Sequence, residues 1–255
     1  MKQLFTAALL LAVLTGCAWK DSGAEQIPSP PTESERTEPA PTESAWLETE
    51  VTAVSTEPAP AETEAPTVPA EPPEDADFVR VLDWIPEMEQ DLKYAGTDNF
   101  TGERIYPFWD GYLRYGTVKK LQRASDMLAE QGYRFKLWDG YRPVSAQWKL
   151  WQVCPDSRYV ANPEQGYSSH SRGNTVDITL VDQEGRELDM PTGFDDFTAR
   201  ADRNYSDCSD SQADNARLLE QTMEACGFSG YFGEWWHFAD TDAYPVERSF
   251  EPPLG

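Results

Sequence analysis

The sequence predicts an α+β domain over residues 78–255, in which helices flank a small antiparallel sheet. Three observations support this fold class. Some segments carry apolar residues at helical spacing, and others are rich in alternating apolar or β-branched residues. These helices and strands follow one another without the regular strand–helix–strand repeat that builds a parallel sheet.

Three helices are expected from apolar spacing and from the residues at their ends. Residues 117–131 place valine and leucine side chains on one face and are followed by Gly132, which can end a helix. Residues 143–151 begin with a proline, which is favoured in the first turn. Residues 212–226 carry apolar side chains at positions i, i+4 and i+7 and precede Gly227, a typical cap.

Three strands are expected between and after these helices. Residues 133–139, YRFKLWD, alternate apolar and polar side chains and run into a loop at Gly140. Residues 174–181, NTVDITLV, are rich in β-branched residues, which favour strands. Residues 235–239, WWHFA, are expected to form the third strand.

Residues 1–17 are typical of an export signal. Lys2 precedes an apolar run that is too short to span a bilayer as a permanent helix. The ending LTGC resembles the bacterial lipobox, in which cleavage occurs just before the cysteine and that cysteine is lipidated. We therefore expect a lipoprotein signal peptide and an extracytoplasmic protein anchored to the bacterial membrane through Cys17. An ordinary signal peptide with a chance cysteine is the alternative.

Residues 18–77 form an acidic segment rich in proline, threonine and glutamate. Eleven of the chain's 20 prolines fall there, and apolar residues are few. Such a segment cannot bury enough surface to offset the entropy of ordering, so a disordered tether between lipid and domain is expected. The net charge of the chain is −24 and residues 78–255 contain no basic cluster, which argues against nucleic-acid binding.

Three cysteines remain once Cys17 is assigned to the lipid. An exported protein can join them in at most one intramolecular disulfide. Cys226 lies at the end of an expected helix, where it can pack as a small hydrophobic residue. A disulfide between Cys154 and Cys208 is therefore expected, with three free buried thiols as the alternative.

The chain contains only two histidines, and each has a carboxylate nearby in the sequence. His170 and Asp177 are seven residues apart, and His237 follows Glu234 by three. Two neutral imidazoles and one carboxylate, with a fourth position left for water, are typical of a catalytic zinc site. His170, Asp177 and His237 are therefore candidate ligands, although a histidine in an aromatic stretch can equally be a core residue.

The spacing of Glu234 and His237 conflicts with a flat strand. Residues three apart on a strand face opposite sides of the sheet, so both can reach one metal only if the chain bends or bulges. Gly233 can assist such a change of direction. A local bend is therefore expected at this point.

Five runs of the sequence, in order, resemble the VanX-type D-alanyl-D-alanine dipeptidases. They are LKYAGTDNFTG, LWDGYRP, SSHSRGNTVDITL, FDDF and EWWHF, within a stretch from about Asp83 to Phe250. These dipeptidases are zinc peptidases that share an α+β fold with D,D-carboxypeptidases and with the Hedgehog signalling domain. The resemblance implies a zinc-dependent enzyme that hydrolyses D-alanyl-D-alanine in cell-wall peptide turnover or glycopeptide resistance.

The resemblance also implies catalytic roles. The three candidate ligands would bind Zn²⁺, and Glu234 would be the general base that takes a proton from water and passes it to the leaving amine. Arg142 would stabilise the developing oxyanion, a role suited to a permanently charged guanidinium. The alternative for Arg142 is an ion pair with Asp139.

Three further positions resemble the substrate-binding residues of this family. Asp195 would hold the free ammonium of the dipeptide, while Tyr94 and Ser168 would line the pocket near the ends of the substrate. Asp196 is a competing alignment for Asp195, and Ser168 can instead be a loop-capping residue. A carboxylate that binds the ammonium would restrict the enzyme to dipeptides, because a longer peptide has a neutral amide there.

Two departures from the classical dipeptidases leave other functions open. The segment between GYRP and SSH looks shorter, and a shorter loop could admit longer substrates, as in a D,D-carboxypeptidase acting on peptidoglycan stem peptides. The lipobox would place the enzyme outside the cytoplasm, where it would meet dipeptide released from the wall or the ends of those stems. The Hedgehog resemblance also allows a non-catalytic zinc-bearing binding module, although binding alone requires neither Glu234 nor Arg142.

Overall fold

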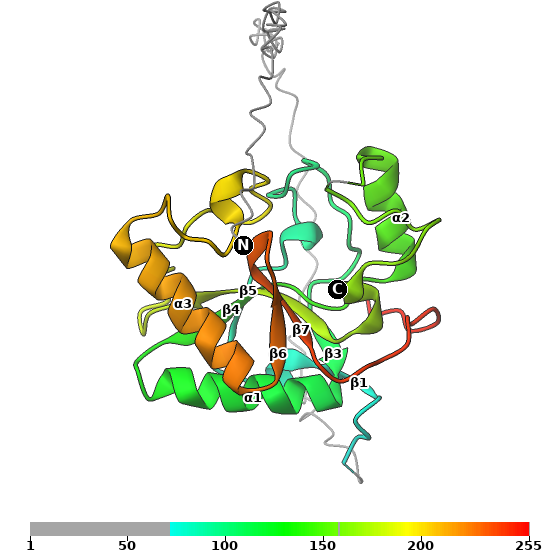
Figure 1. The fold of residues 1–255 in the computed structure, drawn as a ribbon. Coiled ribbons are helices and arrows are strands. Elements are labelled where there is room, and N and C mark those ends of the chain that lie inside the picture. The colour runs from blue at the N-terminus through cyan, green and yellow to red at the C-terminus, as the bar shows by residue number, and fades with distance from the viewer. Residues whose placement is uncertain (1–71, 158, 255) are drawn as a thin grey trace, which may run out of the picture. The chain divides into compact units, whose positions relative to one another are not determined.

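Figure 1 shows the computed structural model, which describes residues 72–157 and 159–254. Five strands form a sheet in the order β2-β4-β5-β7-β6, and β1 and β3 form a separate pair. The strands are β1 (Phe78–Arg80), β2 (Glu89–Gln90), β3 (Tyr112–Arg114), β4 (Arg134–Asp139), β5 (Thr175–Val181), β6 (Phe228–Tyr231) and β7 (Glu234–Asp240). The helices are α1 (Tyr115–Ala129), α2 (Val144–Val153) and α3 (Asp210–Ala225). The predicted α+β class is confirmed.

The three predicted helices are present, with their ends displaced by the residues that cap them. Pro143 is the N-cap of α2, so the helix begins one residue later than expected. Ser209 and Gln212 form a capping box that satisfies the free backbone N–H groups at the start of α3, which therefore begins at Asp210. Helix α1 ends at Ala129, and Gly132 follows it in the left-handed conformation at φ 83°.

The three predicted strands are β4, β5 and β7, which are neighbours at the centre of the sheet. The central pairs are antiparallel, as expected. The sheet is not wholly antiparallel, because the edge strand β2 pairs with β4 in parallel. This strand consists of two polar residues, so it has no apolar alternation by which the sequence could reveal it.

Part of the apolar core lies on the face of the sheet that α1 and α3 cover. Figure 1 shows these two helices together on one side of the sheet, with α2 on the other. On β5, Val176, Ile178 and Leu180 alternate with Asp177 and are all fully buried. Burial of each such side chain contributes roughly 1.5–3 kcal/mol. Because side chains alternate along a strand, the apolar residues anchor the sheet while Asp177 points to the opposite face.

A bulge in β4 changes which side chains reach that opposite face. Leu137 pairs with Ile178, but the register then shifts and Asp139 pairs with Asp177. Directly opposite residues of an antiparallel pair share a face, so the shift brings Asp139 to the side of Asp177. Without it, Asp139 would point toward the helices.

The start of the domain is tied to α1. Backbone bonds join Gly116 to Asp75 and Tyr115 to Asp77, so ordered contacts begin a few residues before the predicted boundary at Phe78. The predicted signal peptide 1–17, the lipidation site Cys17 and all of the tether up to residue 71 lie outside the described residues. Over residues 72–157 and 159–254, no helix has the length and apolar character needed to cross a membrane.

The cysteines do not form the expected disulfide. Cys154, Cys208 and Cys226 are all free thiols, so the pairing of Cys154 with Cys208 is wrong. Cys154 ends α2, and Cys208 precedes the capping box of α3; both pack separately against the core. Cys226 is buried at the end of α3, as predicted, with its sulfur 3.6 Å from that of Met127.

Candidate active site

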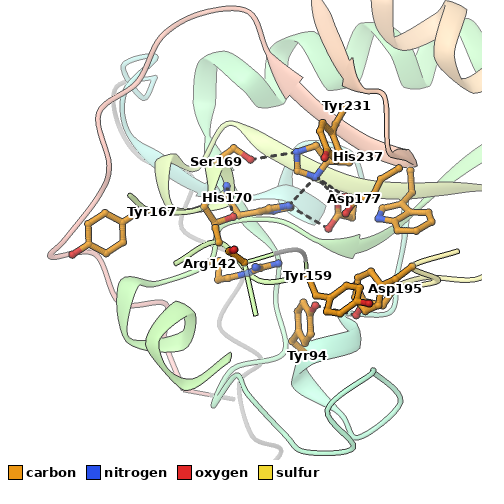
Figure 2. Close-up of a pocket in the computed structure, with 16 residues that line it drawn as sticks. Tyr94, Arg142, Tyr159, Tyr167, Ser169, His170, Asp177, Asp195, Tyr231 and His237 are labelled. Atoms are coloured by element: carbon orange, nitrogen blue, oxygen red, sulfur yellow. Dashed lines mark hydrogen bonds and ion pairs between the residues drawn. The ribbon is translucent and has the colours of Figure 1, made fainter. Parts of the chain in front are cut away.

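The three candidate metal ligands converge on one point. Asp177 and His237 are direct partners in the β5–β7 ladder, and His237 Nδ1 lies 2.9 Å from Asp177 Oδ1. His170 Nε2 lies 3.2 Å from Asp177 Oδ2 and 3.3 Å from His237 Nδ1. Figure 2 shows the three side chains directed at one another, and one ligand atom from each lies within 4.8 Å of the others.

A short 3-10 turn, Ser169–Arg172, carries His170 to this point. The Ser168 hydroxyl accepts a hydrogen bond from the backbone N–H of His170 and so caps the turn. Gly173 ends it in the left-handed conformation, and a Cβ there would lie 2.3 Å from the ring of Phe78. Gly173 is therefore required both by the backbone angle and by the packing.

Hydrogen bonds orient both imidazoles. His170 Nδ1 lies 2.8 Å from the carbonyl oxygen of Gly140, which can only accept, so Nδ1 carries the proton and Nε2 offers its lone pair. On the other ring, His237 Nε2 lies 3.3 Å from the hydroxyl of Ser169, while Nδ1 faces Asp177. Outer partners of this kind fix the tautomer and orientation of metal-binding histidines.

The donor set fits zinc. Zinc–nitrogen bonds of about 2.0–2.1 Å at the tetrahedral angle place two ligand atoms about 3.3 Å apart, which matches the 3.3 Å between His170 Nε2 and His237 Nδ1. Burial alone would raise the pKa of Asp177, but the two imidazoles outweigh it and hold that pKa below its ordinary value. The carboxylate is therefore charged, as a ligand to a cation must be.

Glu234 lies beside the metal ligands but outside their set. Its Oε2 is 3.6 Å from His237 Nδ1, and its side chain is 29% exposed toward the pocket. Burial raises the pKa of this carboxyl above its ordinary value. The register of β6 with β7 shifts between Gly230 and Tyr231, which confirms the predicted irregularity and lets Glu234 and His237 share one side.

Arg142 is buried at the floor of the pocket. Its Nη2 donates to Asp139 Oδ2 at 2.6 Å, Nη1 donates to Gln147 Oε1 at 3.1 Å, and Nε donates to Tyr106 Oη at 3.3 Å. Its Cζ lies 5.0 Å from the ring centroid of Tyr94. The ion pair with Asp139 and the position in the pocket, which were alternative expectations for Arg142, therefore occur together.

Asp195 forms the wall of the pocket opposite the metal ligands, next to Tyr94 (Figure 2). The Tyr94 hydroxyl donates to Asp195 Oδ2 at 2.9 Å. Asp195 has a positive φ of 55°, an uncommon conformation for a residue other than glycine. Burial raises its pKa to about 8. Asp196 does not line the pocket and instead accepts a hydrogen bond from the Thr198 backbone, so the structure favours the alignment on Asp195.

All eight predicted residues of the domain site line one pocket of about 310 Å³. They are His170, Asp177, His237, Glu234, Arg142, Asp195, Tyr94 and Ser168. Ser168 thus lines the pocket and caps the turn. Three exposed aromatic side chains that sequence reasoning missed also line the pocket, namely Tyr159, Phe197 and Tyr231; Figure 2 labels Tyr159 and Tyr231. They belong to loops and to an edge strand, where the sequence gives no sign that they face the site.

Comparison with known proteins gives several relatives that share one description. The family model described as Peptidase_M15, D-ala-D-ala dipeptidase, matches residues 74–252. A D-alanyl-D-alanine dipeptidase of Escherichia coli (strain K12) is 39% identical over 164 residues, which cover 64% of this chain and 84% of the relative. One from Enterococcus faecalis is 37% identical over 193 residues, covering 66% and 94%, and one from Enterococcus faecium is 36% identical over 189 residues, covering 64% and 91%.

Proposed function

Because the chain belongs to the Peptidase_M15 family of D-Ala-D-Ala dipeptidases, a family of zinc metallopeptidases, we propose that it hydrolyses the peptide bond of D-alanyl-D-alanine. Membership of this family makes the chain an enzyme and sets aside the alternative of a non-catalytic binding module. One observation carries the proposal: His170, Asp177 and His237 converge beside Glu234 in a pocket whose far wall holds Asp195.

The donor set described above would hold Zn²⁺. When bound, zinc would polarise the scissile carbonyl and lower the pKa of a water molecule to about 7. Glu234 is placed to take the proton of the attacking water, because it borders the ligands without belonging to them. Its raised pKa suits a base that must later give the proton to the leaving amine.

Arg142 supplies positive charge where negative charge develops. Three of its contacts use one N–H each, with Tyr106, Gln147 and Asp139 as acceptors. A guanidinium has five N–H groups, so two remain for the oxygen of the scissile carbonyl. Because the other three are held in place, the group needs no reorganisation as the oxyanion forms.

Asp195 is proposed to recognise the free ammonium of the dipeptide. Its carboxyl faces the pocket, and burial favours its uncharged form. In that form it would bind a neutral group of the substrate only weakly. An ammonium group favours the carboxylate form, so substrate binding itself would draw the pKa of Asp195 down. A peptide extended at its amino end has no charge at that position and would leave the buried carboxyl without its partner.

The proposed location is outside the cytoplasm, on a lipid attached to Cys17. The sequence features that support it are the lipobox ending LTGC and the acidic tether 18–77. An enzyme in this place would act on dipeptide released from the cell wall rather than on dipeptide inside the cell. Labelling with palmitate tests the anchor, because Cys17→Ala would abolish a label that the wild type carries.

One assay tests the activity and its substrate class. The purified protein, loaded with zinc, is given D-Ala-D-Ala, N-acetyl-D-Ala-D-Ala and a pentapeptide stem ending in D-Ala-D-Ala, and free D-alanine is measured. The proposal expects release from the first substrate alone. Comparable release from the blocked substrates would instead establish the D,D-carboxypeptidase alternative, and no release from any of the three would contradict both.

A further inference from the structure

The pairing of β6 with β7 breaks off next to the site. Phe228 pairs with Asp240 and Gly230 with Phe238, but the next residue, Tyr231, pairs with Glu234. The register therefore skips residues 235–237 of β7, which have no residue of β6 opposite them. Backbone carbonyls left without a ladder partner need another donor, because a buried polar group without one is costly.

Arg203 supplies those donors. Its Nη2 donates to the carbonyl oxygens of Trp235 at 3.1 Å and His237 at 3.0 Å. Its Nε donates to the carbonyl oxygen of Tyr231 at 2.8 Å, and its backbone N–H donates to that of Phe232 at 2.9 Å. Arg203 thus forms hydrogen bonds to residues on both sides of the interruption, including the backbone of the candidate metal ligand His237.

The surroundings hold the guanidinium at this position. Its Cζ lies 4.3 Å from the ring centroid of Phe238, and its Nη1 lies 3.3 Å from Glu220 Oε1 on α3. The Tyr205 hydroxyl donates to the other oxygen of Glu220 at 3.2 Å. The Arg203 side chain is only 6% exposed, so these contacts form inside the protein rather than on its surface.

Gly230 makes room for this arrangement. A Cβ at that position would lie 2.4 Å from Arg203 Cζ and 2.6 Å from Nη2. Gly230 is not among the glycines with positive φ, so alanine suits its backbone angle. The absence of a side chain there therefore serves the guanidinium rather than the conformation of β6.

We propose that Arg203 is a positioning residue for the site: its guanidinium replaces the missing stretch of β6 and holds β7 in the bulged conformation that brings Glu234 and His237 together. It touches neither substrate nor metal. Its effect on metal affinity does not depend on which substrate the enzyme uses, whereas its effect on turnover rests on the proposed function.

The test is a double-mutant cycle on the full chain. Arg203→Met keeps much of the side-chain volume but removes the donors, and Gly230→Ala displaces the guanidinium by contact. Zinc affinity is measured by competition with a chromophoric chelator, and the visible absorption of the cobalt-substituted protein reports the ligand geometry. Arg123→Met, which removes an exposed arginine of α1 whose Nη1 donates to the carbonyl oxygen of Lys119, is the matched control.

Each single variant should lower zinc affinity about 10- to 100-fold, as expected when an outer support of a metal ligand is lost. Each should also shift the cobalt spectrum and lower kcat more than it raises KM. Because Gly230→Ala acts through Arg203, the double variant should bind zinc no less tightly than Arg203→Met alone. Arg123→Met should retain wild-type values.

Wild-type affinity and cobalt spectrum in Arg203→Met would overturn the proposal, as would additive losses in the double variant. If Arg203→Met does not fold, Gly230→Ala alone decides, because it adds one methyl group and removes no side chain. Zinc affinity and the cobalt spectrum are read without any peptide substrate. A failure of the proposed activity therefore leaves this test intact, and a failure of this test leaves the proposed activity standing.

Discussion

The carboxylate of Asp139 and the guanidinium of Arg142 are joined by a 2.6 Å hydrogen bond at the floor of the pocket. Asp139 is 0% exposed and Arg142 is 8% exposed. Asp139 also accepts from the Tyr106 hydroxyl at 2.7 Å and from the Gly140 backbone at 2.8 Å. One carboxylate therefore orients the arginine at the pocket floor and fixes the loop whose carbonyl orients His170.

Asp139→Asn should damage both stability and catalysis. The amide cannot neutralise the buried guanidinium, so the free energy of unfolding should fall by about 3–5 kcal/mol, the usual cost of breaking a buried ion pair. The loosened Arg142 should lower kcat/KM about 100-fold, since small misplacements of a catalytic group have effects of that size. Urea unfolding and steady-state kinetics measure the two effects.

The control for this prediction is Asp83→Asn. Asp83 pairs with Arg80 on the surface, where both side chains are more than 40% exposed. That exposed pair should contribute less than about 1 kcal/mol and nothing to turnover. Equal effects of the two variants would contradict the role given to Asp139.

Glu234→Gln should lower activity without loss of zinc, which distinguishes the general base from the metal ligands. The amide keeps the shape of the side chain but cannot accept a proton, so kcat should fall by a factor of about 10²–10⁴. Zinc content should remain at one ion per chain, because Glu234 lies outside the ligand set. His237→Ala should lose zinc as well as activity, and Glu224→Gln, an exposed position on α3, should change neither.

Loss of zinc from Glu234→Gln would make the carboxylate a ligand and refute its assignment as base. Metal analysis after gel filtration and D-alanine release measure the two properties independently.

The sequence predicted the central strands and all three helices because each carries a strong periodic pattern or a cap. The five family-like runs also contain the eight predicted site residues that the structure brings together in one pocket. One feature that depends on register was not predicted. The bulge of β4 that turns Asp139 toward Asp177 leaves no mark in the alternation of residues 133–139.

Tertiary partners explain the remaining gaps. Arg203 lies far from β7 in the sequence, and a lone arginine in a loop does not reveal that it will complete an interrupted ladder. The irregularity at Glu234 was predictable, because two groups three residues apart had to reach one point. The disulfide was wrong because spacing along the chain does not determine whether two thiols meet in the fold, and Cys154 and Cys208 each remain free.

Asp195→Asn should change the pH dependence of stability. The pKa of Asp195 is about 8 in the folded protein against 3.8 for an ordinary aspartate. Between these values the unfolded chain has released the proton and the folded protein retains it, so the free energy of unfolding falls as pH rises from about 4 to about 8. Asparagine carries no such proton, and the wild type should lose a few kcal/mol more than the variant over that range.

Urea unfolding at several pH values measures this difference, with a chelator present so that metal release does not contribute. Asp196→Asn is the matched control, because Asp196 lies outside the pocket and bonds the Thr198 backbone. Parallel pH profiles for wild type and Asp195→Asn would show that the carboxyl is not held in its neutral form.

Glu247 should give a pH dependence of stability of the opposite sign, which Glu247→Gln should remove. The Glu247 carboxylate anchors the C-terminal segment. Oε1 accepts hydrogen bonds from the backbone of Arg248, Ser249 and Phe250 and from the Ser249 hydroxyl, and Oε2 accepts from Arg114 Nη2 at 3.1 Å. These donors, the Ser249 hydroxyl first, lower the pKa of Glu247 from 4.5 to about 2. The stabilisation is therefore complete above about pH 4.5 and is lost as pH falls toward 2.

At pH 7 the variant should be less stable than the wild type by about 1–3 kcal/mol, a range that allows for the partial exposure of the group. The difference should shrink steadily below pH 4.5, because the wild-type carboxyl takes up a proton and comes to resemble the amide. Thermal unfolding of both proteins between pH 7 and pH 2.5 measures the convergence. A constant difference across that range would show that the effect comes from packing of the C-terminal segment and not from the charge of Glu247.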